Sequence, residues 1–312
     1  MKPQDMEPAM RAEEGPGAAR LRDVARALRP IQWSKNLLLF VPLALTPHAI
    51  GSPAKQLAVI LACVSFSLCA SAGYVLNDLL DRDADRRHPI KRHRPFASGA
   101  LPVALGIALI LLLLASGIAI GFFGTTPAFL AVLAAYLVTT VAYSVFLKQR
   151  LLIDVIVLAG LYTLRVIAGA AAVSIEPTPW LLAFSLFIFL SLAFAKRYSE
   201  LVVTAESRED QLPRRAYRVG DLDLVLILGS SSGYLAVLVL CLYINSDLVR
   251  HLYRNVEVLW LLCPLLLYWI GRIWFLAKRG ELPGDPVAFA IRDPISYAMG
   301  VLAALVIAGA VL

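Results

Sequence analysis

The chain has 312 residues, of which 59% are hydrophobic, with a mean hydropathy of +0.74 and a formal net charge of +7. Soluble domains are about 45–50% apolar, so this composition excludes an ordinary soluble protein and predicts a membrane protein. Basic residues are not interleaved with aromatic ones, and there is no nucleic-acid motif. We therefore expect the lipid bilayer, and no nucleic acid, as a partner.

Residues 1–20 are polar and rich in Gly, Ala and Pro, which predicts a disordered N-terminal tail. Residues 21–35 alternate basic and apolar side chains, a pattern typical of a helix at the membrane surface. We expect residues 21–312 to form a single transmembrane domain.

Nine apolar runs follow this segment, each near the ~20 residues that cross a bilayer. The first is short and contains Pro42 and Pro47, so it is expected to be tilted or broken. The predicted fold is an all-α polytopic membrane helical bundle of about nine transmembrane helices. The runs cover residues 36–50, 56–80, 101–123, 127–147, 151–173, 179–202, 222–245, 256–277 and 295–312.

Lys and Arg are distributed unevenly between the two sides of this predicted bundle. If the N-terminus and every second loop share one side, that side holds 25 of the 29 basic residues. The positive-inside rule then places the N-terminus in the cytoplasm and, after nine spans, the C-terminus outside. The predicted location is the inner (plasma) membrane, as a multi-pass protein.

A stripe of acidic residues, here called the acidic stripe, begins at the end of the second apolar run. Asn77, Asp81 and Asp85 follow one another at intervals of four, about 400° on a helix, with Asp78 beside them. Carboxylates at a helix C-terminus oppose the helix dipole, and clustered oxygen ligands suit Mg²⁺ that holds phosphate oxygens. We take these four residues as candidate metal ligands and catalytic residues. The alternative is a solvated loop whose basic residues neutralise the acids.

A basic segment follows the stripe. Lys91, Arg92 and Arg94 lie between Pro89 and Pro95, which stiffen the segment. Several arginines together form an anion pocket, because the planar guanidinium matches phosphate oxygens. Binding to the membrane surface is the alternative.

Two further candidates lie where the first run begins. Gln32 and Lys35 flank Trp33, which is typical of an interfacial anchor. Lys35 is interpreted either as a snorkelling charge or as a phosphate ligand.

A third polar group runs from Tyr143 and Lys148 to Asp154 and Arg165. Asp154 and Arg165 share a helix face, but they lie about 16 Å apart along the axis and cannot pair directly. An ionisable residue inside a span usually faces a cavity or a partner. Arg165 is therefore a candidate substrate-binding residue, and a structural ion pair between helices is the alternative.

The fourth group is Lys196, Arg197, Tyr198 and Glu200, at the end of the sixth run. Lys196 and Glu200 are four residues apart, so an ordinary helix-surface pair would also explain them. All four of these polar groups are predicted to meet the cytoplasmic face.

Cysteines and long loops complete the pattern. The cysteines at 63, 69, 241 and 263 lie in apolar runs without metal-type spacing, which indicates small core residues rather than disulfides or ligands. Residues 203–220 and 278–294 are polar enough to act as cytoplasmic lids, although the sequence does not show that they close.

The chain resembles the UbiA superfamily of intramembrane prenyltransferases. The resemblance rests on Asn77-Asp78-x-x-Asp81-x-x-x-Asp85, the first aspartate-rich motif of that family, and on about nine spans that cover the chain after residue 20. It implies that the motif binds a diphosphate through Mg²⁺ and helps it to leave.

The chain departs from the family after the sixth span. Typical aromatic prenyltransferases carry a second Asp-x-x-x-Asp motif there, where this chain has Lys196-Arg197-Tyr198-Ser199-Glu200. Together with Arg-Pro-x-Gln-Trp-x-Lys-Asn and His-Pro-x-Lys-Arg-x-Arg-Pro, this segment resembles the decaprenyl-phosphate phosphoribosyltransferase branch. That resemblance implies Mg²⁺-dependent transfer of 5-phosphoribosyl from phosphoribosyl diphosphate to a polyprenyl phosphate.

The candidate residues receive their roles because all of them lie on one predicted face. Tyr198 and Glu200 would orient the sugar or the basic pair. The candidate phosphate-binding residues are Lys35, Arg92, Arg94, Lys148, Lys196 and Arg197.

Other functions stay open at this point. A prenyltransferase would move a polyprenyl group from its diphosphate to an aromatic or other acceptor. A transporter would be expected to show polar residues at the midplane and internal repeats, and a non-catalytic scaffold would not need the acidic stripe.

Overall fold

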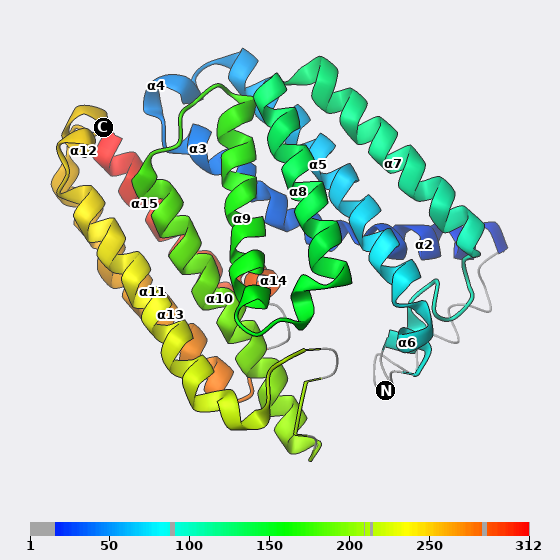
Figure 1. Cartoon of the computed structure of the whole chain (residues 1–312). Coiled ribbons are helices and arrows are strands. Elements are labelled where there is room, and N and C mark those ends of the chain that lie inside the picture. The colour runs from blue at the N-terminus through cyan, green and yellow to red at the C-terminus, as the bar shows by residue number, and fades with distance from the viewer. Residues whose placement is uncertain (1–15, 88–90, 209, 213–214, 283–285, 312) are drawn as a thin grey trace. The chain divides into compact units, whose positions relative to one another are not determined.

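The computed structural model describes residues 16–87, 91–208, 210–212, 215–282 and 286–311 (Figure 1). Their regular structure is helical, apart from an isolated bridge between Gln211 and Arg218. The predicted tail lies mostly outside the described residues. Eight described helices are long and apolar enough to cross a membrane, which confirms the prediction of an all-α, multi-pass integral membrane protein.

The ends of these eight helices lie close to the predicted ends. Two of the helices are extended at their starts by the short 3₁₀ segments η4 (Val219–Asp221) and η5 (Val256–Leu261). The eight are α5 (Pro53–Leu80), α7 (Val103–Gly124), α8 (Pro127–Val145), α9 (Ile153–Ala172), α10 (Pro179–Glu206), α11 (Leu222–Ile244), α13 (Leu262–Lys278) and α15 (Pro294–Val311).

The first predicted span is not a long helix, so the described count is eight rather than nine. It consists of the 3₁₀ segment η1 (Pro30–Phe40) and two single turns, α3 (Val41–Ala44) and α4 (Pro47–Ile50). Pro42 and Pro47 have no backbone N–H to donate to a helical hydrogen bond. The helix is therefore interrupted near these prolines, as the sequence predicted.

The predicted surface helix also has different ends. Helix α2 covers Pro16–Leu28, so it starts inside the predicted tail and stops well before residue 35. Arg29 has a φ of 52°, and Pro30 follows it. A proline disfavours the α conformation in the residue before it, so the chain leaves the helix here.

The chain divides into two compact units that are described separately. Unit 1 comprises Met1–Trp33 and Val64–Phe123, and unit 2 comprises Ser34–Cys63 and Gly124–Leu312. The boundaries fall inside η1, inside α5 and before the last residue of α7. The single transmembrane domain stays a prediction.

Unit 1 contains α2, the second part of α5, the short helix α6 (Arg82–Arg87), the turn η2 (Lys91–His93) and α7. Its buried core includes Ala27, Val75, Phe96 and Leu101. Much of the α7 surface is both apolar and exposed, with Phe123 as the extreme case. Such a surface is expected where lipid is the solvent.

Unit 2 holds the larger core, in which α10 packs against α9 and α11, and α13 packs against α11 (Figure 1). Two of its helices start with the same device. Thr126 and Thr178 are N-caps whose hydroxyls accept a backbone hydrogen bond, and a proline follows each at the first helical position. The remaining elements are η3 (Leu147–Gln149), α12 (Asp247–Leu252) and α14 (Pro286–Arg292).

Candidate functional site

The acidic stripe of unit 1 lies where α5 passes into α6. Helix α5 ends at Leu80 and α6 begins at Arg82, but backbone hydrogen bonds bridge the step. The Asp81 nitrogen donates to the Asn77 carbonyl (2.9 Å), and the Asp85 nitrogen donates to the Asp81 carbonyl (2.8 Å). The four-residue spacing therefore follows a nearly continuous helical run.

Two carboxylates of the stripe converge on one nitrogen. Arg94 Nη1 lies 3.1 Å from Asp78 Oδ1 and 2.7 Å from Asp85 Oδ2. Arg29 Nη2 donates to the same Asp78 oxygen (2.6 Å). Both carboxylates are buried, so their charge is balanced locally by the two guanidinium groups.

The other half of the stripe is more open. Asn77 and Asp81 are half-buried, and the Asn77 amide donates to Asp81 Oδ2 (3.3 Å). In the described part of the chain, no three acidic, His or Cys side chains are already gathered around one point. The convergence of Asp78 and Asp85 on a single nitrogen nevertheless fits one cation, and carboxylate and amide oxygens are ligands that Mg²⁺ prefers.

The basic segment is split by the structure. Arg94 reaches the carboxylates, whereas Lys91 and Arg92 lie exposed on η2, where Arg92 Nε contacts His93 Nε2 (3.3 Å). Gln32 is half-buried in η1.

Arg29 is the acid-binding residue of unit 1 that the sequence reasoning left out of the candidate set. Its guanidinium also lies 5.4 Å from the Tyr74 ring centroid. The signal was its place as the first residue of Arg-Pro-x-Gln-Trp-x-Lys-Asn.

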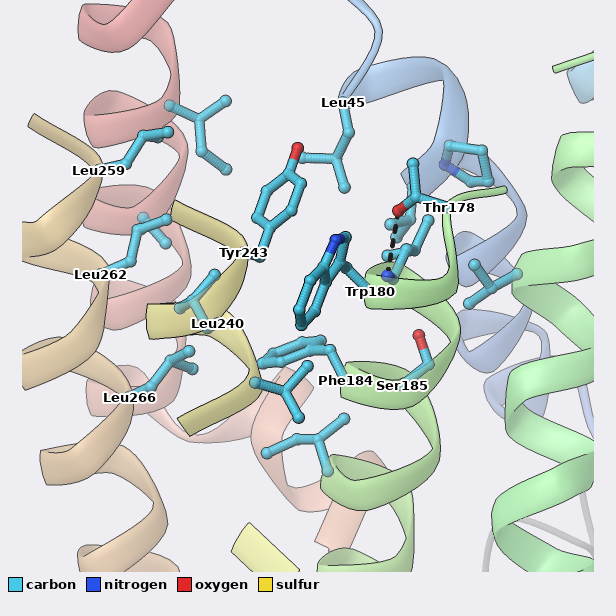
Figure 2. A pocket seen from close by; sticks show the side chains of 18 of the residues that line it. Leu45, Thr178, Trp180, Phe184, Ser185, Leu240, Tyr243, Leu259, Leu262 and Leu266 are labelled. Atoms are coloured by element: carbon cyan, nitrogen blue, oxygen red, sulfur yellow. Dashed lines mark hydrogen bonds between the residues drawn. The ribbon is translucent and has the colours of Figure 1, made fainter. Parts of the chain in front are cut away.

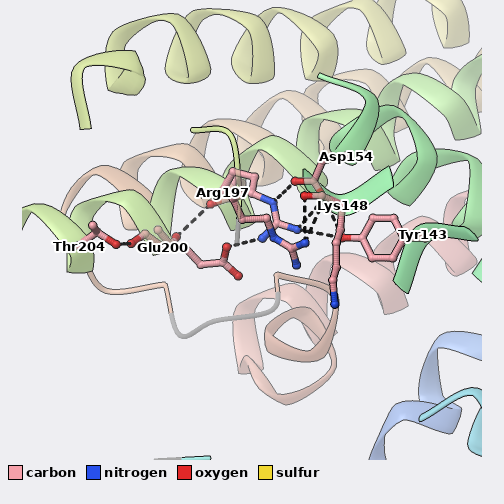
Figure 3. Close-up of polar contacts among 9 residues, drawn as sticks. Tyr143, Lys148, Asp154, Arg197, Glu200 and Thr204 are labelled. Atoms are coloured by element: carbon pink, nitrogen blue, oxygen red, sulfur yellow. Dashed lines mark hydrogen bonds and ion pairs between the residues drawn. The ribbon is translucent and has the colours of Figure 1, made fainter. Parts of the chain in front are cut away.

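A buried charge network in unit 2 is built on Arg197 of α10 (Figure 3). Its Nε donates to Asp154 Oδ2, and its Nη2 lies 3.2 Å from Asp154 Oδ1. Its Nη1 pairs with Glu200, one helical turn further on. Both Arg197 and Asp154 have no exposed side-chain surface, so this is an ion pair fully removed from solvent.

Tyr143 completes the network. Its hydroxyl donates to Asp154 Oδ1 (2.7 Å) and accepts from Arg197 Nη2 (3.1 Å). The two carboxylates at this end, Asp154 and Glu200, are therefore both bound by Arg197. The arginine is held by three side chains, which suits a positioning role.

The chain after α10 folds back onto this network. Arg215 Nη1 donates to the Lys148 carbonyl (3.1 Å) and lies 4.0 Å from Asp154 Oδ1. Burial and the negative charge of Asp154 raise the pKa of Tyr217 to about 12, so its hydroxyl stays protonated at neutral pH. Arg215 and Tyr217 were not among the residues predicted from the sequence. The only sequence signal for this segment was the number of Lys and Arg residues in 196–218.

The other predicted site residues at this end of unit 2 differ in burial and in their neighbours. Lys148 is buried in η3, and Lys196 is half-buried. Tyr198 packs edge-on against Trp274 (6.0 Å between ring centroids), in the core shared with α13.

A second buried cluster of unit 2 surrounds Arg165, midway along α9. Its Nε donates to Asn36 Oδ1 (3.0 Å), and its Nη2 donates to the Tyr136 hydroxyl (3.0 Å). Lys35 Nζ lies 5.7 Å from the ring centroid of Tyr162, which also faces Arg165 (5.3 Å). Arg165 thus bonds to Asn36 and Tyr136, whereas Asp154 bonds to Tyr143 and Arg197. Arg165 fixes η1 and so places Lys35.

Unit 2 also contains an apolar cavity of about 490 Å³ (Figure 2). Trp180 and Phe184 of α10 face it, as does Tyr243 of α11. Its lining also includes Leu38 and Val166, which are near neighbours of Asn36 and Arg165 in the chain. The cavity is therefore suited to an apolar ligand.

The sequence model of the UbiA prenyltransferase family matches residues 37–292. The nodulation protein NoeC of Azorhizobium caulinodans is 37% identical over 86% of this chain and 86% of its own length. The uncharacterized protein y4nM of Sinorhizobium fredii is 38% identical over 91% of this chain, which spans 55% of that protein.

The decaprenyl-phosphate phosphoribosyltransferase of Mycobacterium tuberculosis is 37% identical over 60% of this chain and 62% of its own length. Among solved structures, a UbiA homolog from Archaeoglobus fulgidus bound to GPP and Mg²⁺ matches with a TM-score of 0.66. It is 18% identical and covers 92% of this chain and 97% of its own.

Proposed function

Because the chain belongs to the UbiA prenyltransferase family, whose members are integral membrane transferases, we propose that it transfers 5-phosphoribosyl from phosphoribosyl diphosphate to a polyprenyl phosphate. The reaction uses Mg²⁺ and releases diphosphate. The alternative within the family, transfer of a polyprenyl group from its diphosphate, is one outcome of the test below.

The observation that carries this choice is the charge network at the end of α10. Its two carboxylates, Asp154 and Glu200, both bind Arg197. They are therefore poorly suited to bind a metal ion and diphosphate in addition to those at the acidic stripe. Lys148, Lys196 and Arg215 lie around them. Basic side chains gathered at this end favour two phosphate-bearing substrates over an aromatic acceptor, because a phosphate monoester needs cations to hold it. The identity with decaprenyl-phosphate phosphoribosyltransferases supports the same choice.

The acidic stripe is the proposed diphosphate site. Asn77, Asp78, Asp81 and Asp85 would hold the metal, and their oxygen donors suit it. When bound, Mg²⁺ neutralises the charge that builds on the departing diphosphate. Arg94 and Arg29 are half-exposed, so their side chains have room to contact phosphate oxygens when the carboxylates bind the ion.

The acceptor is proposed to lie in unit 2. Its apolar tail would occupy the cavity beside Trp180, and its phosphate would lie near Lys35 and Arg165. A phosphate monoester is largely ionised at neutral pH, so no strong base is needed. A phosphate oxygen forms the bond to the anomeric carbon of ribose as the bond from that carbon to diphosphate breaks.

The proposed orientation in the membrane follows from the uneven distribution of Lys and Arg residues. With the broken segment from Pro30 to Ile50 counted as the first crossing, the arginine-rich loops lie in the cytoplasm and the C-terminus lies outside. Phosphoribosyl diphosphate, a water-soluble anion, would then reach the site from the cytoplasm.

The test is a transfer assay with the purified full-length protein, Mg²⁺ and polyprenyl phosphate. Phosphoribosyl diphosphate labelled in the ribose is expected to give a labelled product that extracts with lipid. Absence of labelled lipid would reject the proposal. Consumption of polyprenyl diphosphate with an aromatic acceptor, under the same conditions, would establish the alternative.

A further inference from the structure

Two of the four cysteines of the chain meet in unit 2. Cys241 Sγ of α11 lies 3.3 Å from Cys263 Sγ of α13, although 22 residues separate them. Both thiols are free in the structure. A disulfide bond is about 2.05 Å long, so the two sulfur atoms are about 1.3 Å farther apart than bonded sulfur atoms.

The other two cysteines have different surroundings. Cys63 Sγ faces the Asn36 carbonyl (3.7 Å). Cys69 is fully buried and lies against Gly117, where a Cβ would collide with its sulfur. The close contact between thiols is thus specific to Cys241 and Cys263 among the described cysteines, and the cysteine spacing in the sequence did not predict it.

The pair also lies near a helix end. Cys241 is three residues, about 4.5 Å along the axis, from Ile244, where α11 ends. Cys263 is the second residue of α13. Thiol chemistry is controlled by access; Cys241 is half-buried and Cys263 is buried, so Cys241 is the more accessible of the two thiols.

Each cysteine stands next to a residue that lines the apolar cavity. Leu240 precedes Cys241, and Leu262 precedes Cys263 (Figure 2). A covalent link between the two sulfur atoms would therefore fix the separation of two walls of this cavity.

We propose that Cys241 and Cys263 are an oxidisable pair whose disulfide staples α11 to α13 beside the cavity. One thiolate attacks the sulfur of a disulfide-class oxidant, such as oxidised glutathione, and releases one thiol. The second thiolate then attacks the mixed disulfide and releases the second thiol. The protein loses two electrons and two protons, and the oxidant is reduced to two thiols.

The test treats the solubilised full-length protein with oxidised glutathione and counts its thiols with a maleimide that adds mass. Two of the four thiols are expected to disappear, and mass spectrometry is expected to find the Cys241–Cys263 peptide pair. The same loss is expected in Cys69→Ser, whereas Cys241→Ser is expected to form no internal disulfide. This assay needs no substrate, so it is independent of the proposed transfer reaction.

The staple has a second readout, the thermal unfolding midpoint. The oxidised protein is expected to melt above the reduced protein, because the link restrains the unfolded chain, and Cys241→Ser is expected to show no such difference. Retention of all four thiols, pairing through Cys63 or Cys69, or an unchanged midpoint after oxidation would each overturn the proposal.

Discussion

Arginine–carboxylate contacts occur in two very different settings in this chain. The side chains of Arg29 and Arg94 are 26% and 27% exposed where they bind Asp78. Those of Arg197 and Asp154 are both 0% exposed. In the first setting the carboxylate of Asp78 is buried but the two arginines are partly exposed, so they can turn toward solvent if a metal ion takes their place, whereas a fully buried pair that loses one partner leaves an uncompensated charge. The first setting suits exchange with a bound ion, and the second suits a fixed scaffold.

This difference predicts how Arg197 responds to mutation. Arg197→Met leaves Asp154 charged and buried, so we expect the protein to lose about 3–5 kcal/mol of stability. The measurement is thermal unfolding of the solubilised protein. Arg250→Met, which changes an exposed arginine of α12, serves as the matched control and is expected to change little.

A double-mutant cycle separates the ion pair from lost packing. Combining Arg197→Met with Asp154→Asn removes the buried charge, so the double variant should be clearly more stable than the sum of the single changes predicts. Strictly additive losses would contradict the assigned pairing.

Single residues could be recognised in the sequence more readily than their partners. Asp154 and Arg197 both stood out as ionisable residues in or near apolar runs, but 43 positions separate them. Their pairing depends on how α9 packs against α10, which periodicity does not encode. The same reason explains why Arg215 and Tyr217 were missed.

The helices themselves follow closely from local sequence. The run predicted at residues 151–173 is α9, Ile153–Ala172. Hydropathy fixes where a span lies, and the Thr-Pro pairs at 126–127 and 178–179 fix where two helices begin. The exception is the first run, where prolines turned a predicted helix into η1 and two short turns. Hydropathy records that such a segment is apolar but not how its backbone is arranged.

One helix contact is close enough to predict the effect of a single methyl group. A Cβ at Gly169 of α9 would collide with the backbone carbonyl of Leu39, whereas a Cβ at Gly160 of the same helix would meet nothing within 4 Å. We expect Gly169→Ala to destabilise the protein by about 1–3 kcal/mol through overpacking.

Gly160→Ala is the matched control, because it adds the same methyl group to the same helix without a collision. We expect its unfolding temperature to stay at or above that of the wild type. If Gly169→Ala were equally stable, α9 would not pack against η1 as the structure describes.

At the scale of the whole molecule, the chemistry is divided between the two compact units. Unit 1 carries the acidic stripe with Arg29 and Arg94, and unit 2 carries the Arg197 network, the Arg165 cluster and the apolar cavity. Sequence reasoning predicted both sets as parts of one transferase, because a motif can be matched to a family without its geometry. It did not predict which basic side chains bind the acidic ones.

The acidic stripe is proposed to hold the diphosphate that is released when a lipid phosphate bonds to the anomeric carbon of ribose. The most direct measurement is diphosphate released from phosphoribosyl diphosphate by the wild-type protein, Asp81→Asn and Asp83→Asn. Asp83 is a suitable control because it lies outside the stripe and is exposed beside Arg82 and Arg86.

For the wild type, we predict one diphosphate released per lipid-linked ribose phosphate formed, with no release when Mg²⁺ or polyprenyl phosphate is omitted. Asp81→Asn should fold normally but lose at least about 100-fold in rate, the scale on which a group that stabilises developing charge acts. Asp83→Asn should stay near wild type. Wild-type release by Asp81→Asn, or release from polyprenyl diphosphate alone, would contradict the claim.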